Sequence, residues 1–322
     1  MPIHSLGYRE WTGPLSSAES RWTVIAWIGV RRAWQSMWLR RIVFFSWVPG
    51  VLMALLIYLF EQAASEGQAG TFISSGMVRF FLEGGERRSL QESLAASQGV
   101  SQDLVKYRHE FWCSLLQVLY QRSQAIMLIP VIGITAPPLI SQDMRSRAFL
   151  LYFSRPISRT QYICGKAASV ACYVLLISLL PGMMLYCTGV LLSPEISIVL
   201  DTWDIPLRVL AATATMVIPT TCIGLMLSSL TTETRFASFA WFSVWVFGFF
   251  SYFVTSSFTS FGSDTPGQML SLFHVISRVQ EWLLDIRPET QIEVAAPVAV
   301  LFGVTVLSLA VLYRRVSSPL SV

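Results

Sequence analysis

The sequence predicts an all-α polytopic membrane protein with six transmembrane helices and both termini in the cytoplasm. Hydrophobic residues make up 53% of the chain and charged residues only 13%, whereas soluble domains carry about 25% charged residues. Six long apolar stretches, uncharged apart from Arg208 at the outer end of the fourth, are close to the roughly 20 residues that a helix needs to cross a bilayer. Basic residues also concentrate in alternate connecting segments, which is the pattern of cytoplasmic loops.

We expect the six spans at residues 42–60, 125–140, 167–192, 207–230, 236–255 and 294–313. The segments then assigned to the cytoplasm hold 14 basic and 4 acidic residues: 1–41, 141–166, 231–235 and 314–322. The segments assigned to the outside hold 8 basic and 15 acidic residues: 61–124, 193–206 and 256–293. The arginines therefore mark the cytoplasmic ends of spans and do not indicate a nucleic-acid partner.

Residues 1–41 are expected to form a cytoplasmic N-terminus with a helix that lies along the membrane surface. Ser16 and Glu19 have the spacing of a capping box, and the helix would continue to about Arg41. Arginines are available to one side of this helix, and an apolar stripe follows the other: Trp27, Val30, Trp34 and Trp38. Such a helix lies in the interface and contacts membrane lipid.

The extracytoplasmic segment 61–124 is long but has too few apolar residues for a core of its own. An apolar stripe leads from it into the second span: Phe111, Leu115, Val118 and Leu119. The segment could cap the outer surface or dock an extracytoplasmic partner. In the second span, Pro130 and the pair Pro137-Pro138 predict a fixed kink or a hinge.

Residues 141–166 form a basic loop between two uncharged runs, with five basic residues and one acid. Asp143 and Arg147, four residues apart with the acid first, favour a short helix. The apolar face of this helix would contain Phe149, Tyr152 and Phe153. Pro156 would end the helix and hold Arg155 extended. A capping box formed by Ser158 and Gln161 would then begin the third membrane helix.

The remaining spans carry two patterns. Thr220, Gly224 and Ser228 recur every four residues, as on a face for close helix packing. The fifth span has an aromatic stripe on one side: Trp241, Trp245, Phe249 and Tyr252. Such a stripe is typical of lipid-facing or core packing, although it could also contact an amphiphilic substrate.

In loop 256–293, a capping box at Thr265 and Gln268 predicts a helix at the outer interface, with an apolar face of Leu272, Phe273, Ile276, Val279 and Leu283.

Several kinds of chemistry are not expected in this chain. No span holds a charged residue between its ends, which argues against an ion-coupled carrier, although hydroxyls and carbonyls can hold sodium. His109-Glu110 resembles half of a zinc motif, but Cys113 stands where the second histidine would be. No phosphate-binding loop occurs. We therefore expect no catalytic, cofactor-binding or metal site.

The basic loop resembles the first cytoplasmic loop of permeases of the type-2 class of ATP-binding-cassette (ABC) exporters. That loop has an acid after the second span, an apolar helix, a Ser-Arg-Pro turn, a Ser-Arg pair and a Gly-Lys pair. The matching residues are Asp143, residues 149–153, Ser154-Arg155-Pro156, Ser158-Arg159 and Gly165-Lys166. The six-span layout extends the resemblance over most of the chain, although segment 61–124 is longer than in compact members.

The resemblance implies a permease subunit in the plasma membrane of a bacterium, paired as a homodimer or heterodimer. A separate cytoplasmic ABC ATPase would bind ATP and Mg, and the N-terminal helix would be an elbow helix. The residues implied in ATPase coupling are Asp143, Arg145, Arg147, Phe149, Tyr152, Phe153, Arg155 and Pro156. Thr135 and the aromatic stripe of the fifth span are the candidates for the substrate path. The alternatives are an ion-coupled secondary carrier and a non-transporting scaffold that transmits force to an extracytoplasmic partner.

Overall fold

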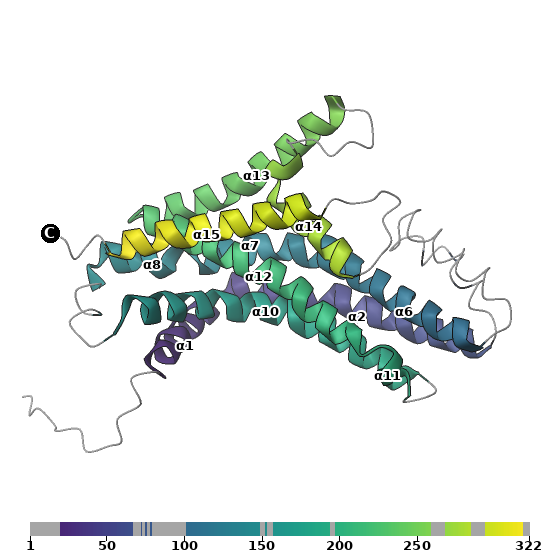
Figure 1. Ribbon diagram of the computed structural model, residues 1–322. Coiled ribbons are helices and arrows are strands. Elements are labelled where there is room, and N and C mark those ends of the chain that lie inside the picture. The colour runs from purple at the N-terminus through teal and green to yellow at the C-terminus, as the bar shows by residue number, and fades with distance from the viewer. Residues whose placement is uncertain are drawn as a thin grey trace, which may run out of the picture.

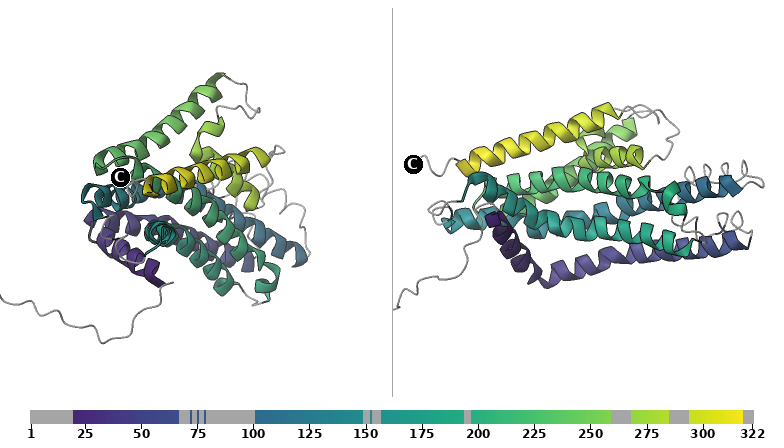
Figure 2. Two further views of the ribbon diagram at one scale, coloured as in Figure 1. Left: turned by 60° about the vertical axis from the view of Figure 1, so that its left-hand side comes forward. Right: turned by 60° about the horizontal axis from the view of Figure 1, so that its bottom comes forward.

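The computed structural model describes residues 20–66, 72, 75, 78, 101–148, 152, 157–193, 197–258, 268–284 and 294–317. Helices and no strands are found among these residues. The long helices run side by side along one axis, and the short helix α1 crosses them at one end (Figure 1). Helix α13 leans away from the others toward its C-terminal end in two views (Figures 1 and 2).

Six helices are long and apolar enough to cross a membrane, as the sequence predicts: Met37–Ser65, Arg108–Arg145, Arg159–Leu192, Asp204–Leu230, Thr234–Ser257 and Ala295–Ser317. The first is α2 (Met37–Ser65), and the third is α10 (Arg159–Leu192). The last three correspond to α12 (Asp204–Leu230), α13 (Thr234–Phe258) and α15 (Ala295–Ser317). Two shorter helices, α11 (Ile198–Asp201) and α14 (Leu272–Leu283), lie at the end of the bundle that is predicted to be extracytoplasmic.

The N-terminal helix is shorter than predicted. It is α1 (Arg21–Trp34), and α2 begins only three residues later. Between them, Ser36 adopts an extended backbone, and its Oγ accepts a hydrogen bond from the Leu39 amide at 3.4 Å. The predicted continuous helix to Arg41 is therefore wrong, because Ser36 acts as the N-cap of a new helix. The capping box at Ser16 and Glu19 lies outside the described residues.

Helix α1 is held against the first half of α10. The Ser169 hydroxyl donates to the Ala26 carbonyl at 3.1 Å, and the Tyr173 hydroxyl donates to the Val30 carbonyl at 2.6 Å. The indole ring of Trp34 stacks on Tyr173 with ring centroids 6.2 Å apart. These contacts fix α1 to the third span.

The second span is built from four consecutive pieces: α6 (Ser101–Val118), the π-helix η2 (Leu119–Gln124), α7 (Ala125–Thr135) and α8 (Pro137–Arg145). The break at Ala136 precedes Pro137 and Pro138, where the sequence predicts a kink or hinge. In the π-helix, the Tyr120 hydroxyl lies 2.7 Å from Thr213 Oγ1, and the Gln124 amide donates to the Ser178 carbonyl at 3.1 Å. The widened turn thus joins the second span to α10 and α12.

The outer part of the second span is buried. The predicted apolar stripe is confirmed, since Phe111, Leu115, Val118 and Leu119 are each at most 4% exposed. The Phe111 ring lies against Phe60 of α2, with centroids 4.4 Å apart. Beside it, Arg108 and Glu61 form a buried ion pair at 2.9 Å. This region anchors α6 to α2.

The small-residue face of α12 packs on the second span at its proline break. A Cβ added at Gly224 would lie 2.9 Å from Ile132 and 3.0 Å from Ala136. The Ser228 hydroxyl donates to the Pro137 carbonyl at 2.6 Å and accepts from the amides of Ile140 and Ser141 at 3.2 and 3.1 Å. Ser228 thereby satisfies backbone groups at a point where two prolines interrupt the helical pattern.

Ser228→Ala is expected to lower the free energy of unfolding by about 1–3 kcal/mol, because a buried hydrogen-bonding group loses its partner. The measurement is the thermal unfolding midpoint of the purified protein in detergent. Ser178→Ala is the matched control, because the Ser178 hydroxyl is also buried but donates to Val174 of its own helix. Equal midpoints for the two variants would contradict this role of Ser228.

Helix α14 enters the bundle with the apolar face that the sequence predicts. Leu272, Ile276 and Val279 are buried, and Phe273 and Leu283 are half-buried. The helix begins at Leu272, after a 3-10 turn over Gln268–Leu270, and the predicted start at Thr265 lies outside the described residues. Helix α14 packs against α12, α13 and α15.

Candidate functional site

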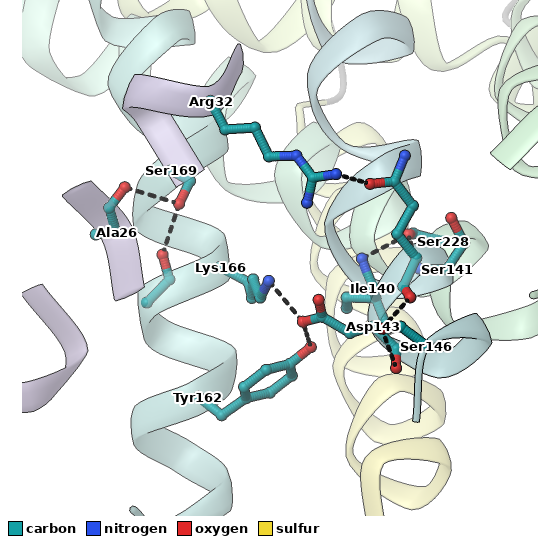
Figure 3. A network of polar contacts seen from close by, with 12 residues as sticks. Ala26, Arg32, Ile140, Ser141, Asp143, Ser146, Tyr162, Lys166, Ser169 and Ser228 are labelled. Carbon is teal, nitrogen blue, oxygen red and sulfur yellow. Dashed lines mark hydrogen bonds and ion pairs between the residues drawn. The ribbon is translucent and has the colours of Figure 1, made fainter. Parts of the chain in front are cut away.

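A buried acid–base pair lies where α8 ends and α10 begins (Figure 3). One carboxylate oxygen of Asp143 accepts from both Lys166 Nζ and the Tyr162 hydroxyl, each at 2.7 Å. Asp143 is 8% exposed, Lys166 is 6% exposed and Tyr162 is fully buried. A charge removed from water in this way needs an opposite charge and hydrogen bonds, and this site provides both. The pair connects the second span to the third.

The local backbone explains why Asp143 pairs with Lys166 and not with Arg147. Helix α8 ends at Arg145, and Arg147 has a left-handed backbone with φ 55°. The predicted helical pair of Asp143 with Arg147 is therefore wrong, because the helix that would place them on one face has already ended. The capping box of Ser158 and Gln161 is confirmed at the start of α10. It sets the register in which Tyr162 and Lys166, four residues apart, share a face.

Tyr152 extends the buried pair into the loop. Its ring lies 5.4 Å from that of Tyr162, and Lys166 Nζ lies 5.8 and 5.4 Å from the ring centroids of Tyr152 and Tyr162. A cation over two rings is attracted by their faces. Burial, followed by the nearby Asp143 carboxylate, raises the pKa of the Tyr152 phenol, so that it stays neutral. Tyr152 therefore fixes part of the loop to α10.

Two further contacts extend this region. The Arg32 guanidinium of α1 donates to the side-chain carbonyl of Gln142 (Figure 3). Arg145 forms an exposed ion pair at 3.3 Å with Glu233, in the short connection between α12 and α13. We call the interacting group that joins α1, α8, α10 and the loop the Asp143 cluster: Arg32, Gln142, Asp143, Tyr152, Tyr162 and Lys166.

The predicted coupling residues thus fall into three groups. Asp143 and Tyr152 face inward, where they belong to the Asp143 cluster. Arg145 and Arg147 are exposed at the same end of the bundle. Four of the predicted residues lie outside the described part of the chain: Phe149, Phe153, Arg155 and Pro156.

The aromatic stripe of α13 faces the bundle. Trp241 and Trp245 are buried, and the Trp241 indole donates to the Ile129 carbonyl at 2.8 Å. Phe249 is 41% exposed and lies 5.1 Å from the Phe273 ring of α14. The last member, Tyr252, stacks on the His274 ring of α14 at 3.4 Å. The stripe therefore packs on α7 at one end and on α14 at the other.

Thr135, the other residue that the sequence places on a substrate path, is 2% exposed. Its hydroxyl donates to the Val131 carbonyl of its own helix at 2.8 Å. The side chain therefore has a partner within α7.

The contact of α14 with α13 is expected to depend on pH through His274. Burial, followed by the charge of Arg278, lowers the pKa of His274 to about 4, from 6.5. Below pH 6.5 the unfolded chain takes up this proton before the folded protein does, so stability falls as the pH drops toward about 4. The difference between unfolding midpoints at pH 7 and pH 5 should shrink in His274→Phe, which keeps a stacked ring. An unchanged difference would contradict this assignment.

Sequence reasoning missed most of the Asp143 cluster. Lys166 was recognised only as part of the Gly-Lys pair, and Tyr162, Arg32 and Gln142 were not singled out. One signal was available: Asp143 is the single acid in a basic loop, and Lys166 is the last charge before an uncharged run. No pattern in the sequence links α1 to the end of α8.

The sequence matches a known protein family over nearly its whole length. The sequence profile of the family described as ABC-2 family transporter protein matches residues 23–317, which include the Asp143 cluster and all six candidate spans. No curated protein and no solved structure is similar enough to extend the comparison. The chain therefore belongs to the ABC-2 transporter family, and it is an integral membrane permease subunit that pairs with a separate ABC ATPase.

Proposed function

We propose that this chain couples ATP hydrolysis by a cytoplasmic ABC ATPase to the export of a substrate across the plasma membrane of a bacterium. Two copies, or this chain and a second permease, would assemble with two ATPases that bind the ATP and Mg. The observation that carries the proposal is the Asp143 cluster, because it joins the end of α8 to the first turns of α10, the two points between which the basic loop lies. The excess of basic residues at this end supports a cytoplasmic location.

The cluster is suited to transmit a displacement. Separating a buried, hydrogen-bonded ion pair costs several kcal/mol, so Asp143 and Lys166 would move together when an ATPase pushes the loop. The contact of Arg32 with Gln142 would carry α1 along. The movement would enter the bundle through α8 and α10 at the same time, as expected of a coupling element.

The second span offers places where such a movement could be converted into a change of shape. The break at Ala136 lies within two turns of Asp143, and the π-helix η2 lies farther along the same span. Both points interrupt the regular hydrogen-bond ladder, and interruptions of this kind are where helices bend. The stripe on α13 packs beside this span, so a bend would alter the surface that contains Trp241 and Trp245.

The first test is the isolation of the tagged protein from its native membranes in a mild detergent. We expect a soluble protein with a phosphate-binding loop to accompany it in stoichiometric amount. Recovery of the chain alone, with crosslinking as well, would overturn the proposal. Transport that survives ATP depletion but not the collapse of an ion gradient would instead identify a secondary carrier.

Arg147→Glu is expected to reduce the recovery of the ATPase by about tenfold, because charge reversal in an interface costs at least 1.4 kcal/mol where the partner surface is acidic. The measurement is the ratio of ATPase to permease after affinity purification. Arg314→Glu is the matched control, because Arg314 is an exposed arginine near the end of α15, on the same end of the bundle. A similar loss in both variants would show a general effect of charge and not a contact of the loop.

A further inference from the structure

Two side chains of α13 bind backbone carbonyls of α7, the piece of the second span that precedes the proline break. The Trp241 indole donates to the Ile129 carbonyl at 2.8 Å. The Ser238 hydroxyl donates to the Gly133 carbonyl at 3.3 Å. The helices approach closely here, since a Cβ added at Gly133 would lie 2.7 Å from the Phe242 ring and 3.1 Å from Trp241 Cδ1. Farther along, α13 leans away from the other helices (Figures 1 and 2), so its first half is the part held by the second span.

The Gly133 carbonyl needs a partner from outside its own helix. The residue four positions later is Pro137, and proline has no N–H to donate. Pro138, five positions later, lacks one for the same reason, and the Ala136 amide donates to a different carbonyl. A carbonyl freed by proline within a membrane must be satisfied by a neighbouring group. Ser238 is that group, and it comes from another span.

A third contact joins α13 to α8, on the other side of the break. The Thr234 hydroxyl lies 3.1 Å from the Ser141 hydroxyl. Ser141 also donates to the Pro137 carbonyl at 2.6 Å, so it keeps a partner if Thr234 moves away. If Ser238 moved away, the Gly133 carbonyl would lose the donor that takes the place of the missing amide. When the second span bends at the break, α13 therefore leaves α8 at a lower cost than it leaves α7.

From this arrangement we propose that Ser238 is a positioning residue for the movement of the permease, because it makes α13 follow α7 when the loop displaces the second span. The inference rests on the proposed function, since it takes the ATPase as the source of the displacement. It adds a route by which that movement reaches the fifth span. The route continues along the aromatic stripe to Tyr252, which stacks on His274 of α14.

A thermodynamic cycle tests the hydrogen bond in the purified full-length permease, without an ATPase. Ser238→Ala is expected to lower the thermal unfolding midpoint by about 2 °C, as for the loss of one hydrogen bond. Pro137→Ala restores an amide that can donate to the Gly133 carbonyl. In that background, Ser238→Ala should cost less than half as much, because the two donors replace each other.

Pro130→Ala is the matched control for the cycle. Pro130 is also a proline inside α7, but an amide at that position would serve the carbonyl of Ile126, four residues earlier. Ser238→Ala should therefore cost its full amount in the Pro130→Ala background. A loss of the same size in the Pro137→Ala and Pro130→Ala backgrounds would overturn the inference.

A second measurement follows the movement itself, in the complex with the ATPase in lipid nanodiscs. An environment-sensitive fluorescent amino acid replaces one of two exposed serines: Ser146, just after α8, or Ser257, near the C-terminal end of α13. Emission is compared without nucleotide and after ATP is trapped with vanadate. We expect ATP to shift the emission at both positions. Ser238→Ala should at least halve the shift at position 257 and leave the shift at position 146 unchanged.

Two variants separate positioning from a general loss of structure. Ser238→Thr keeps a hydroxyl and should restore the shift at position 257. Ser243→Ala removes another half-buried serine of α13 and should leave that shift unchanged. An equal shift at position 257 with and without Ser238→Ala would overturn the inference, and so would a shift at position 146 without one at position 257. The absence of a shift at position 146 would contradict the proposed function as well, so the two failures are distinguishable.

Discussion

Asp143→Leu is expected to lower the free energy of unfolding by about 3–5 kcal/mol, because it leaves the Lys166 ammonium buried without its counter-ion. The Tyr162 hydroxyl loses its acceptor in the same step. The measurement is the unfolding midpoint in detergent, together with the amount of ATPase that copurifies. Arg145→Leu is the matched control, since its ion pair with Glu233 is exposed and exposed pairs contribute at most about 1 kcal/mol.

The double variant Asp143→Leu/Lys166→Met makes this prediction specific. Replacing both members of a buried pair by apolar residues of similar size is often nearly neutral. The double variant should therefore be markedly more stable than Asp143→Leu alone, which is a strongly non-additive result. If the losses from Asp143→Leu and Lys166→Met simply add, the two side chains do not act as a pair, and the account of this cluster is wrong.

Gly165→Val is expected to separate α1 from α10. A Cβ at position 165 would lie 2.8 Å from the Trp22 backbone carbonyl and 2.8 Å from Ile25 Cβ. A backbone atom cannot move aside as a flexible side chain can, so α1 must shift. Overpacking of this kind typically costs about 1–3 kcal/mol. We expect faster cleavage of α1 by added protease and a weaker association with the ATPase.

Gly303→Val provides the control for Gly165→Val. Gly303 lies in α15, and an added Cβ there meets nothing within 4 Å. The two variants introduce the same side chain into a long helix, so a difference between them reports the contact with α1. If α1 in Gly165→Val resists protease as well as it does in Gly303→Val, the close approach of α1 and α10 does not hold α1 in place.

Much of this fold depends on residues that are close together in the sequence and could therefore be predicted. Long uncharged runs define the spans, because a helix in lipid must satisfy its own backbone. The capping box at Ser158 and Gln161 involves residues three apart, so its signal is contained in one short stretch. The same is true of the four-residue period of Gly224 and Ser228, which predicts a packing face without naming the helix that meets it.

The features that could not be predicted depend on contacts between distant residues. Asp143 pairs with Lys166 and not with Arg147, because α8 ends at Arg145. The four-residue spacing from Asp143 to Arg147 predicted a pair on one helix, and that prediction was wrong. The break at Ser36 was missed because the arginines and tryptophans on both sides continue the same amphipathic pattern. Gln280 was overlooked because α14 was interpreted as an interfacial helix, although its packing against three other helices buries that side chain.

The most direct test of the central claim is a crosslink from the loop to the ATPase. A photo-crosslinking amino acid placed at position 147 would be activated in native membranes. The same amino acid at position 257, near the C-terminal end of α13, would serve as the control at the opposite end of the bundle. The account predicts a crosslink to the ATPase from position 147 and none from position 257. A crosslink from position 257 alone, or none from 147 while the ATPase still copurifies, would contradict the assignment of this loop as the coupling element.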